Sequence, residues 1–592
     1  MPVLDARTGL LIEPARDDLL TPFARSLLGK YYSRPGETPQ MAYARACRAW
    51  GSDLAHAQRL YDAVSKGWFM FASPVLSNAP LPGERVKAMP ISCFLNYVDD
   101  SIAGLNDHTV ETRWLAVLGG GVGGHWSAVR AVSEKAPGPI PFMHCMDADM
   151  EAYKQGTTRK GSYAAYLDVS HPDILEFINI RVPTGDETRK CLGAGFHNAV
   201  NIPDAFMEAV LRDEPWELRC PHEGTVRDTL RARDLWQQIL EIRYRTGEPY
   251  LHFIDASNRA LPEPLKVKGL RVRGSNLCSE ITLPTARDRT AVCCLSSLNL
   301  ELWDEWRDTG LIGDVLEMLD NVLQYFIDHA PEPLWRAVAS ARAERSVGLG
   351  AMGWHAYLQR RMIPVESEAA REVNQAIFRE IHRQGMMRNL KLGQERGEAP
   401  DMAGTGRRWS HMFAIAPNAN SSILLATSPS IEVAKANAYK HQTRAGTWPV
   451  QNRYLEAVLE AKGKNTDEVW QDIILSKGSV QHLGFLDDHE KAVFKTAIEV
   501  DQMWVVRHAA DRQPYVCQAQ SLNLFFPPRA DRAYVNRVHL AAWRLGLKSL
   551  YYLRTEAPNR AEDVSRTVER VALRDGASVT AEVEEGCVSC QG

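Results

Sequence analysis

Several features that define special classes of protein are missing from this chain. No stretch approaches the roughly 20 apolar residues of a membrane-spanning helix. The first residues, MPVLDARTGLLIEPARDD, lack the basic segment and apolar run of a secretory signal. The net charge of −4 gives no reason to expect a nucleic-acid or membrane surface. We therefore expect a cytoplasmic protein that binds neither membranes nor nucleic acid.

Cysteine is present, but its pattern excludes a disulfide scaffold and a zinc scaffold. The eleven cysteines are odd in number and dispersed over 592 residues, whereas disulfide scaffolds are short and cysteine-dense. Cys587 and Cys590 form a CxxC, but no second CxxC or HxxxH stands nearby to complete a zinc site. The CxxC spacing suits thiol–disulfide exchange and favours a mobile dithiol over two idle tail cysteines. We expect no bound metal.

Helical and strand-like patterns alternate along the chain. Residues 16–70, most of 311–400, and blocks near 450–476 and 487–510 have helical apolar spacing. Short apolar runs fill 71–300, no repeat of fixed period occurs, and KSLYYLRT has the pattern of a buried strand. This alternation predicts an α/β fold. We expect a helical region over 1–70, a catalytic α/β domain over 71–556 and a flexible tail over 557–592, where apolar content is low.

Two small-residue segments are candidates for ligand contact. LGGGVGG contains a GxGxxG at Gly119, Gly121 and Gly124, but neither a following helix nor an acid about 20 residues on completes a dinucleotide fingerprint. These glycines form either a plain turn or a close approach of the backbone to a ligand or another segment. In FAIAPNANSSILLAT, Ser421 and Ser422 could start a helix, whose free N–H groups bind phosphate or are simply capped.

Polar and sulfur-containing residues also stand in otherwise strand-like runs. RGSNLCSEITLPT places Asn276, Cys278 and Glu280 at alternate positions, so an extended strand would put all three side chains on one face. VCCLSSLNL contains Cys293 and MPISCFLNYVDDSI contains Cys93; either alone is typical of a buried small hydrophobe. The adjacent tyrosines of LKSLYYLRT would face opposite sides of a strand and, alone, indicate core packing.

In combination these segments resemble one family. ASPVLSN, ISCFLNYVDDSI, SNLCSEITLPT, VCCLSSLNL, RSVGLGAMGW, APNANSS, LKSLYYLRT and the tail dithiol occur in the order found in the large catalytic subunit of class I ribonucleotide reductase. The resemblance extends from about residue 20 to the end. It implies a ten-stranded α/β barrel with a finger loop that carries a radical cysteine, preceded by a helical N-terminal region.

The resemblance implies a role for each reactive residue. Cys278 matches the cysteine whose thiyl radical takes the 3′ hydrogen of a ribonucleoside diphosphate. Glu280 matches the general base for the 3′-OH, and Asn276 matches an amide that binds the substrate's hydroxyls. Cys93 and Cys293 match the dithiol that supplies two electrons, and Cys294 should then face away from that pair.

The resemblance also implies partners for this radical chemistry. Tyr551 and Tyr552 match the relay that brings the radical from a separate, metal-containing small subunit, so this chain itself needs no permanently bound cofactor. Cys587 and Cys590 match the tail dithiol that re-reduces the active site and is recharged by thioredoxin or glutaredoxin.

Substrate and effector residues follow from the same match. The residues expected to hold the substrate and its phosphates are Ser73, Ser92, Gly121, Pro417, Asn418, Ala419, Asn420 and Ser421. The residues expected at a dNTP/ATP specificity site on a homodimer interface are Asp100, Arg130, Gln155 and Arg159. Because the helical pattern starts by about residue 20, we expect no room for an N-terminal ATP cone and no shut-off by dATP through one.

Two other readings are compatible with parts of the pattern. A cobalamin-dependent reductase that retains a tyrosine pair would share the tail spacing, although that class has no need of the pair. A catalytically silent nucleotide-binding subunit would share the fold. The complete set of Asn276, Cys278, Glu280, Cys93 and Cys293 argues against a silent subunit.

Overall fold

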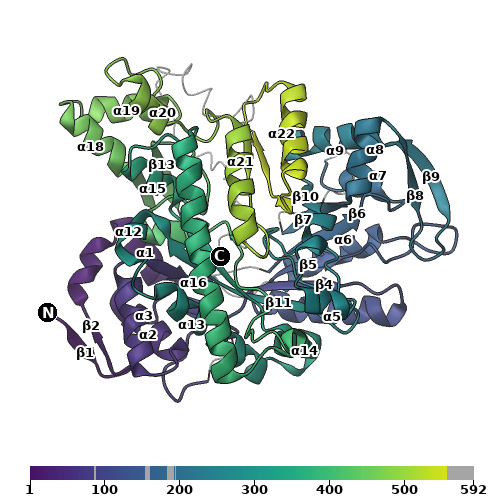
Figure 1. Cartoon of the computed structure of the whole chain (residues 1–592), viewed down its shortest axis with the longest axis horizontal. Helices are drawn as coiled ribbons and strands as arrows, with labels where there is room; N and C mark the ends of the chain where they lie inside the picture. Colours follow the sequence, from purple (N-terminus) through teal and green to yellow (C-terminus); the bar gives the residue numbers. More distant parts are fainter. Residues whose placement is uncertain (86–87, 154–160, 183–191, 194, 444–445, 556–592) are drawn as a thin grey trace, which may run out of the picture.

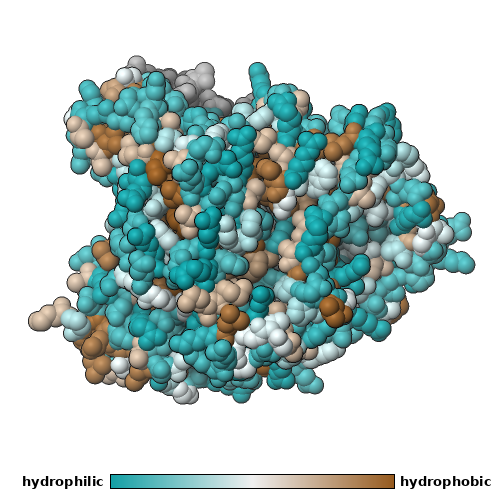
Figure 2. Space-filling view, viewed as in Figure 1, coloured by the Kyte–Doolittle hydropathy of each residue, from teal (hydrophilic) through white to brown (hydrophobic). Residues whose placement is uncertain are grey.

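The computed structural model describes residues 1–85, 88–153, 161–182, 192–193, 195–443 and 446–555. A curled sheet lies in the middle, the N-terminal helices lie at one side, and a small helical lobe lies above them (Figure 1). The visible surface is mainly hydrophilic and is hollowed between that lobe and the N-terminal helices (Figure 2). Among the described residues, no helix is long and apolar enough to cross a membrane.

The N-terminal region is helical, as predicted, with one addition. Its elements are the hairpin β1 (Val3–Asp5) and β2 (Leu10–Ile12), the 3-10 helix η1 (Pro14–Leu19), α1 (Pro22–Tyr31), α2 (Pro39–Trp50) and α3 (Leu54–Ser65). Thr21, Thr38 and Asp53 cap the three α-helices by accepting a backbone N–H. The short hairpin was not predicted.

The central sheet has nine strands within the described part of the chain. They are β3 (Phe69–Phe71), β4 (Cys93–Tyr97), β5 (Gly121–His125), β6 (Ser162–Asp168), β7 (Phe196–Ile202), β10 (Tyr250–Phe253), β11 (Ala291–Asn299), β12 (Val347–Met352) and β16 (Ser549–Leu550). Their order is β12-β11-β4-β5-β6-β7-β10-β16, with β3 also paired to β11. The strands from β4 to β10 are parallel, and every residue of β11 is buried, as a run covered on both faces requires.

Two extended segments continue this sheet into a ring. Phe413, in the first segment, pairs in parallel with Leu349 of β12. Ile415 of the same segment pairs in parallel with Gln520 of the second segment. The N–H of Tyr551 then donates to Leu522 O at 2.9 Å, which joins the second segment to the chain just after β16. Eight strands of the ordered path and these two segments therefore make ten members. The prediction of an α/β barrel with ten strands is confirmed.

Helices cover the outside of this barrel. In chain order they are α4 (Ser73–Ser77), α5 (Ile102–Val117), α6 (Ile140–Ala152), α7 (Ile174–Ile178), α8 (Asp204–Arg212), α9 (Ala232–Thr246), α10 (Ile254–Arg259), α11 (Glu263–Val267), η2 (Leu300–Leu302), α12 (Trp303–Trp306), α13 (Leu311–His329), η3 (Glu332–Leu334), α14 (Trp335–Glu344), α15 (Trp354–Arg360), α16 (Glu368–Arg396), η4 (Pro400–Met402), α17 (Ala419–Leu425), α21 (Gln502–Arg512), η5 (Gln513–Tyr515) and α22 (Arg532–Arg544). Two smaller strand pairs lie outside the sheet: β8 (Pro215–Arg219) with β9 (Val226–Arg231), and β15 (Leu524–Phe526) with β17 (Leu553–Thr555).

The small lobe has a hydrophobic core of its own. It comprises the hairpin β13 (Ala438–Thr443) and β14 (Gly446–Gln451) and the helices α18 (Arg453–Ala461), α19 (Asp467–Leu475) and α20 (Asp488–Val493). Leu455, Leu459, Trp470 and Phe494 belong to a cluster separate from the main core. The helical blocks predicted near 450–476 and 487–510 thus belong partly to this lobe and partly to α21.

Candidate active site

The segment 273–285 is a loop, and the prediction of an extended strand at Asn276, Cys278 and Glu280 is wrong. Residues 277–279 form a turn and a bend, and Ser279 has a φ of +67°. The side-chain oxygen of Asn276 accepts the N–H groups of Glu280 and Ile281 at 3.1 Å each. Because this amide turns the backbone back on itself, strand alternation does not apply here.

Glycines of β5 make room for this finger loop. A Cβ at Gly123 would lie 1.9 Å from Ser275 O, and one at Gly121 would lie 2.9 Å from Leu277 Cδ2. Each position therefore needs the absence of a side chain. Of the two readings of the glycine segment, the structure supports a close approach of the backbone to another chain segment.

Backbone carbonyls of the loop are held by hydroxyl groups from the barrel. The Tyr166 hydroxyl donates to Asn276 O at 2.6 Å, the Ser521 hydroxyl to Cys278 O at 2.6 Å, and the Ser549 hydroxyl to Ser279 O at 2.7 Å. Ser521 Oγ also lies 3.1 Å from Glu280 Oε2. Three strands or segments thus fix three peptide groups of one short loop, which is how a reactive side chain is kept in place.

Asn276 also presents a donor to the interior. Its Nδ2 is buried and has no hydrogen-bond partner among the described residues. An unpaired buried donor costs about 1–3 kcal/mol, so its persistence beside a thiol and a carboxylate indicates a site for a polar ligand. Cys278 and Glu280 are themselves buried, at 6% and 1% exposure.

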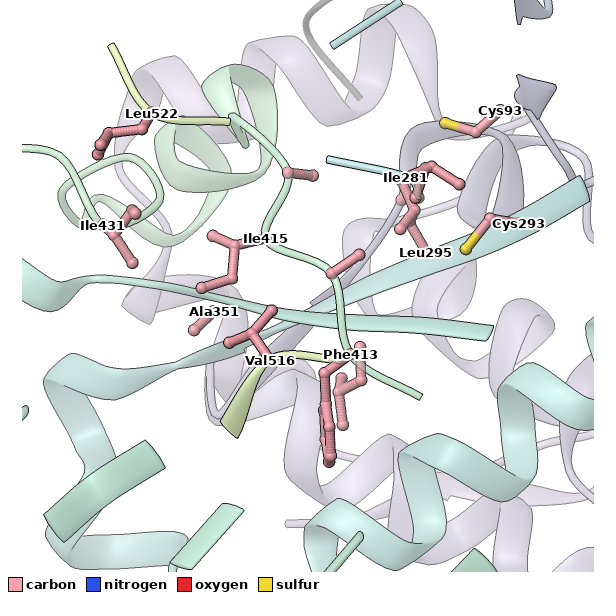
Figure 3. Packing of buried hydrophobic residues seen from close by; sticks show 14 of the residues in the cluster. Cys93, Ile281, Cys293, Leu295, Ala351, Phe413, Ile415, Ile431, Val516 and Leu522 are labelled. Atoms are coloured by element: carbon pink, nitrogen blue, oxygen red, sulfur yellow. The ribbon is translucent and has the colours of Figure 1, made fainter. Parts of the chain in front are cut away.

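Cys93 and Cys293 are brought together although 200 positions separate them in the sequence. They are direct partners in the antiparallel pairing of β4 with β11. Such partners have Cα atoms about 4.5–5.5 Å apart, inside the range of about 4.4–6.8 Å that a disulfide spans. Figure 3 shows both thiols at one edge of the hydrophobic cluster that contains Ile281 and Leu295. Burial, with Cys294 and Cys93 nearby, raises the pKa of the Cys293 thiol well above its usual value.

The neighbouring Cys294 faces the other side of β11, as predicted. Its thiol donates to Leu319 O in α13 at 3.3 Å. The thiol of Cys293 instead lies 3.7 Å from Gln518 Nε2. Only Cys293 of the two can therefore pair with Cys93.

Tyr551 and Tyr552 do not face opposite sides of a strand. The predicted buried strand is broken between β16 and β17, and the two rings have centroids 4.3 Å apart. The same buried cluster contains Cys278 and Tyr250. Tyr250 lies 4.7 Å from Tyr551 and 5.0 Å from Tyr552 between ring centroids. Sequence reasoning missed Tyr250, because a tyrosine in a short apolar run has no pattern that separates it from core packing.

The residues expected to hold the substrate lie in two groups. The backbone N–H of Gly121 donates a hydrogen bond to Ser92 O at 2.7 Å, beside Cys93. The Ser421 hydroxyl lies 3.5 Å from Phe71 O, which puts the start of α17 next to the segment that leads to Ser73. The remaining members, Pro417, Asn418, Ala419 and Asn420, run into that helix start.

Asp100 and Arg130, the expected effector residues, form an ion pair. Arg130 Nε lies 3.0 Å from Asp100 Oδ2, and His222 Nδ1 lies 3.0 Å from the same oxygen. The hydrogen bond that Arg130 donates to Asp100 raises the pKa of Arg130. His222 was not predicted, since it stands in the turn between β8 and β9 without a motif. The expected positions Gln155, Arg159, Cys587 and Cys590 lie outside the described residues.

Comparisons with known proteins agree with this geometry. A family model described as "Ribonucleotide reductase, barrel domain" matches residues 91–406 and 399–553, and one described as "Ribonucleotide reductase, all-alpha domain" matches residues 18–84. A protein of Frog virus 3 named as a ribonucleoside-diphosphate reductase large subunit is 51% identical over 578 residues, covering 97% of this chain and 98% of the relative.

More distant relatives agree with these matches. The ribonucleoside-diphosphate reductase large subunit of Invertebrate iridescent virus 3 is 42% identical over 644 residues, covering 98% of this chain and 100% of the relative. The solved alpha subunit of the class Id ribonucleotide reductase of Actinobacillus ureae superposes with a TM-score of 0.81 at 32% identity, covering 91% of this chain and 98% of that chain.

Proposed function

Because this chain belongs to the ribonucleotide reductase family as a class I large subunit, we propose that it reduces ribonucleoside diphosphates to 2′-deoxyribonucleoside diphosphates through a thiyl radical on Cys278. The single observation that carries the assignment of residues is the direct pairing of Cys93 with Cys293. The comparisons give no support to the cobalamin-dependent alternative.

In the first step Cys278 takes a hydrogen atom from C3′ of the ribose. The S–H bond that forms is close in strength to the C–H bond that breaks, so the step is reversible. Glu280 accepts the proton of the 3′-OH as general base, and the Nδ2 donor of Asn276 binds the ribose hydroxyls. The immobilised backbone of the finger loop supports these roles because it keeps the three groups in one arrangement.

In the second step the 2′-OH leaves as water. Its departure needs one proton, and reduction of the sugar radical needs two electrons and a further proton. Cys93 and Cys293 supply both protons and both electrons by closing a disulfide, and Cys278 then returns the 3′ hydrogen. The high pKa of Cys293 suits this role, since a protonated thiol is the proton donor that the step requires.

The radical enters from the separate small subunit of the class I enzyme. We assign Tyr552 as the outer and Tyr551 as the inner member of the relay. Tyr552 is 6% exposed and lies under the exposed guanidinium of Arg554, whose Cζ is 3.8 Å from the ring centroid, whereas Tyr551 is 1% exposed. The 4.3 Å contact between the rings provides the electronic path from one to the other.

Assembly and regulation form the second part of the proposal. We propose a homodimer that uses α5, on which Ile102, Val110 and Trp114 are exposed. At its interface Asp100 and Arg130, with Gln155 and Arg159, bind dNTP or ATP effectors. Because α5 begins directly after Asp100, its exposed apolar side chains support a shared position for interface and effector site.

The remaining residue assignments concern substrate binding and re-reduction. The segment 417–421, with Ser73, Ser92 and Gly121, holds the substrate and its diphosphate. Residues 557–592 act as a tail on which Cys587 and Cys590 reduce the Cys93–Cys293 disulfide, and thioredoxin or glutaredoxin recharges them. These partners support the expectation of a cytoplasmic enzyme.

Conversion of labelled CDP to dCDP tests this function. The purified chain would be supplied with a dithiol and either a cognate small subunit or adenosylcobalamin alone. We expect product only with the small subunit. Product with cobalamin alone would overturn the class I mechanism, and no product with the small subunit would overturn the proposed activity.

A further inference from the structure

A buried acid–histidine pair lies beside Tyr552 and has no part in the steps above. His197 belongs to β7, and Glu248 precedes the neighbouring strand β10. His197 Nδ1 lies 2.7 Å from Glu248 Oε1 and 3.4 Å from the hydroxyl oxygen of Tyr552. Both members of the pair are 3% exposed. One imidazole nitrogen thus connects the phenol of the relay to a buried carboxylate.

The surroundings keep this carboxylate ionised. Burial acts to raise the pKa of Glu248, but the charges of His197 and Arg181 and the hydrogen bonds from His197 and the Asn198 N–H lower it below its usual value. Arg181 Nε lies 3.3 Å from Glu248 Oε2, and the N–H of Asn198 donates to that oxygen at 3.2 Å. An ionised carboxylate in hydrogen-bond contact with an imidazole can accept a proton.

Other titratable or charged groups among the described residues also border the pair. The Tyr250 ring stacks on His197 with centroids 5.9 Å apart. Burial lowers the pKa of Arg243 in α9 to about 9, and the charge of Glu248 acts against that shift. Arg554 covers the Tyr552 ring. Arginine and ordinary tyrosine stay protonated near neutral pH. Within the described part of the chain, Glu248 is therefore an acceptor within reach of the Tyr552 hydroxyl through His197.

A proton acceptor is needed because a tyrosine loses its phenolic proton when it loses an electron. Tyr552 is buried, so the proton has little access to bulk water. If the oxidised ring of Tyr552 kept its proton, it would be a cation, which is unfavourable in a low-dielectric site. The positive charge of the Arg554 guanidinium over the ring would make it still less favourable.

We propose that the His197–Glu248 pair takes the phenolic proton of Tyr552 when the small subunit oxidises this ring and returns it when the small subunit reduces the ring again, an inference that rests on the radical relay proposed above. The electron passes to the radical delivered by the small subunit, and the O–H bond of Tyr552 breaks. Its proton bonds to His197 Nδ1 as the proton that Nδ1 shares with Glu248 moves to Oε1. The products are a neutral tyrosyl radical and a neutral carboxylic acid, and the imidazole, which gains one proton and gives up one, keeps its original protonation state. Tyr551 then reduces the Tyr552 radical by passing it both an electron and its own phenolic proton, and the pair keeps its proton until the radical returns and the small subunit reduces Tyr552.

Removing the phenolic proton chemically is the test that separates this role from packing. The variants Glu248→Gln and His197→Gln, each close in size to the native residue, would be compared with the native chain in CDP reduction with the small subunit. Each would also carry a fluorotyrosine at position 552 whose phenol ionises near neutral pH. His508→Gln, which alters a buried histidine in α21 that donates to Val365 O, is the matched control. CDP binding would verify that each variant is folded.

With tyrosine at position 552 we expect both variants to lose at least about tenfold in turnover, equivalent to ~1.4 kcal/mol of barrier. With the fluorotyrosine we expect this loss to disappear as the pH rises above the ionisation of the phenol, because no proton then needs an acceptor. Any loss in His508→Gln should not depend on that ionisation. Native turnover in the variants, or a loss that persists with the ionised phenol, would overturn the proton-acceptor role. Absence of turnover in the native chain would instead overturn the proposed function.

Discussion

Cys93 and Cys293 lie directly opposite each other across β4 and β11, while Cys294, the next residue, points its sulfur to Leu319 O on the other side. Two adjacent cysteines of similar burial thus occupy different chemical positions. The pairing across strands, and not the order of residues along one strand, decides which thiol can form a disulfide with Cys93.

This arrangement predicts opposite effects of two neighbouring substitutions. Cys293→Ser should lower the turnover of CDP with a dithiol by at least about 100-fold, equivalent to ~2.7 kcal/mol, because no disulfide can close on Cys93. Cys294→Ser keeps a donor for Leu319 O and should stay within about twofold of the native kcat. Formation of dCDP in the presence of the small subunit measures both. Equal losses in the two variants would contradict the assignment of Cys293.

The relay predicts that two phenol hydroxyls are essential although their rings pack in the core. Tyr551→Phe and Tyr552→Phe keep the ring contacts but remove the O–H that is oxidised, so each should abolish turnover and leave CDP binding unchanged. Tyr163→Phe is the control, because its hydroxyl is buried and bonded to Trp126 Nε1 at 2.7 Å. It should cost about 1 kcal/mol of stability and retain turnover. Activity in either relay variant would show that the pair is only packing.

Sequence patterns singled out residues of the candidate site without describing their geometry. Asn276, Cys278 and Glu280 stood out because polar side chains recur at alternate positions. The same spacing fits a strand and a tight loop equally. What decides between them is the Asn276 side chain, which accepts hydrogen bonds from the backbone N–H groups of Glu280 and Ile281, and spacing does not reveal these bonds.

Residues brought together only by the barrel could not be predicted from local patterns. Tyr250 and His197 lie on adjacent strands 53 positions apart, and no motif marks either one. Tyr551 and Tyr552 were expected on opposite faces because alternation assumes a continuous strand. The break after Leu550 places their rings together instead. Pairing across strands and interruption of strands are properties of the whole fold.

A buried charge cluster on α13 predicts a pH-dependent loss of stability. Asp320 pairs with Arg345 at 2.9 Å, with Arg408 at 3.1 Å and with Arg396 at 3.1 Å. Burial acts to raise the pKa of Asp320, but Arg345 and Arg408 lower it below its usual value. Asp320→Asn leaves these buried cations uncompensated, so we expect a loss of about 3–5 kcal/mol in the free energy of unfolding at neutral pH.

The direction of the pH effect follows from the lowered pKa of Asp320. Its contribution is fully present above the unfolded value of about 3.9 and is lost as the pH falls through the lower folded value. The difference between Asp320→Asn and the native chain, measured by urea unfolding, should therefore shrink below about pH 4. Asp18→Asn is the control, because its pair with Arg25 is exposed and should contribute about 0–1 kcal/mol. A difference that stays constant down to low pH would contradict this account.

The finger loop predicts that one methyl group placed in β5 will disable the enzyme without unfolding it. The Cβ of Gly123→Ala would lie 1.9 Å from Ser275 O and 2.9 Å from the Cα of Asn276. Because both contacts are with backbone, the loop must move, and a displacement of about 1 Å from productive geometry can cost about 100-fold in rate. We expect that loss in kcat for CDP.

The matched control is Gly484→Ala, since no atom lies within 4 Å of its added Cβ. It should leave turnover unchanged, and the midpoint of thermal unfolding should separate a local displacement from general destabilisation. If Gly123→Ala lost activity only in proportion to a fall in that midpoint, the loop would be no more sensitive than the rest of the barrel. Loss of turnover in a chain that still unfolds near the native temperature would show that β5 sets the position of Cys278.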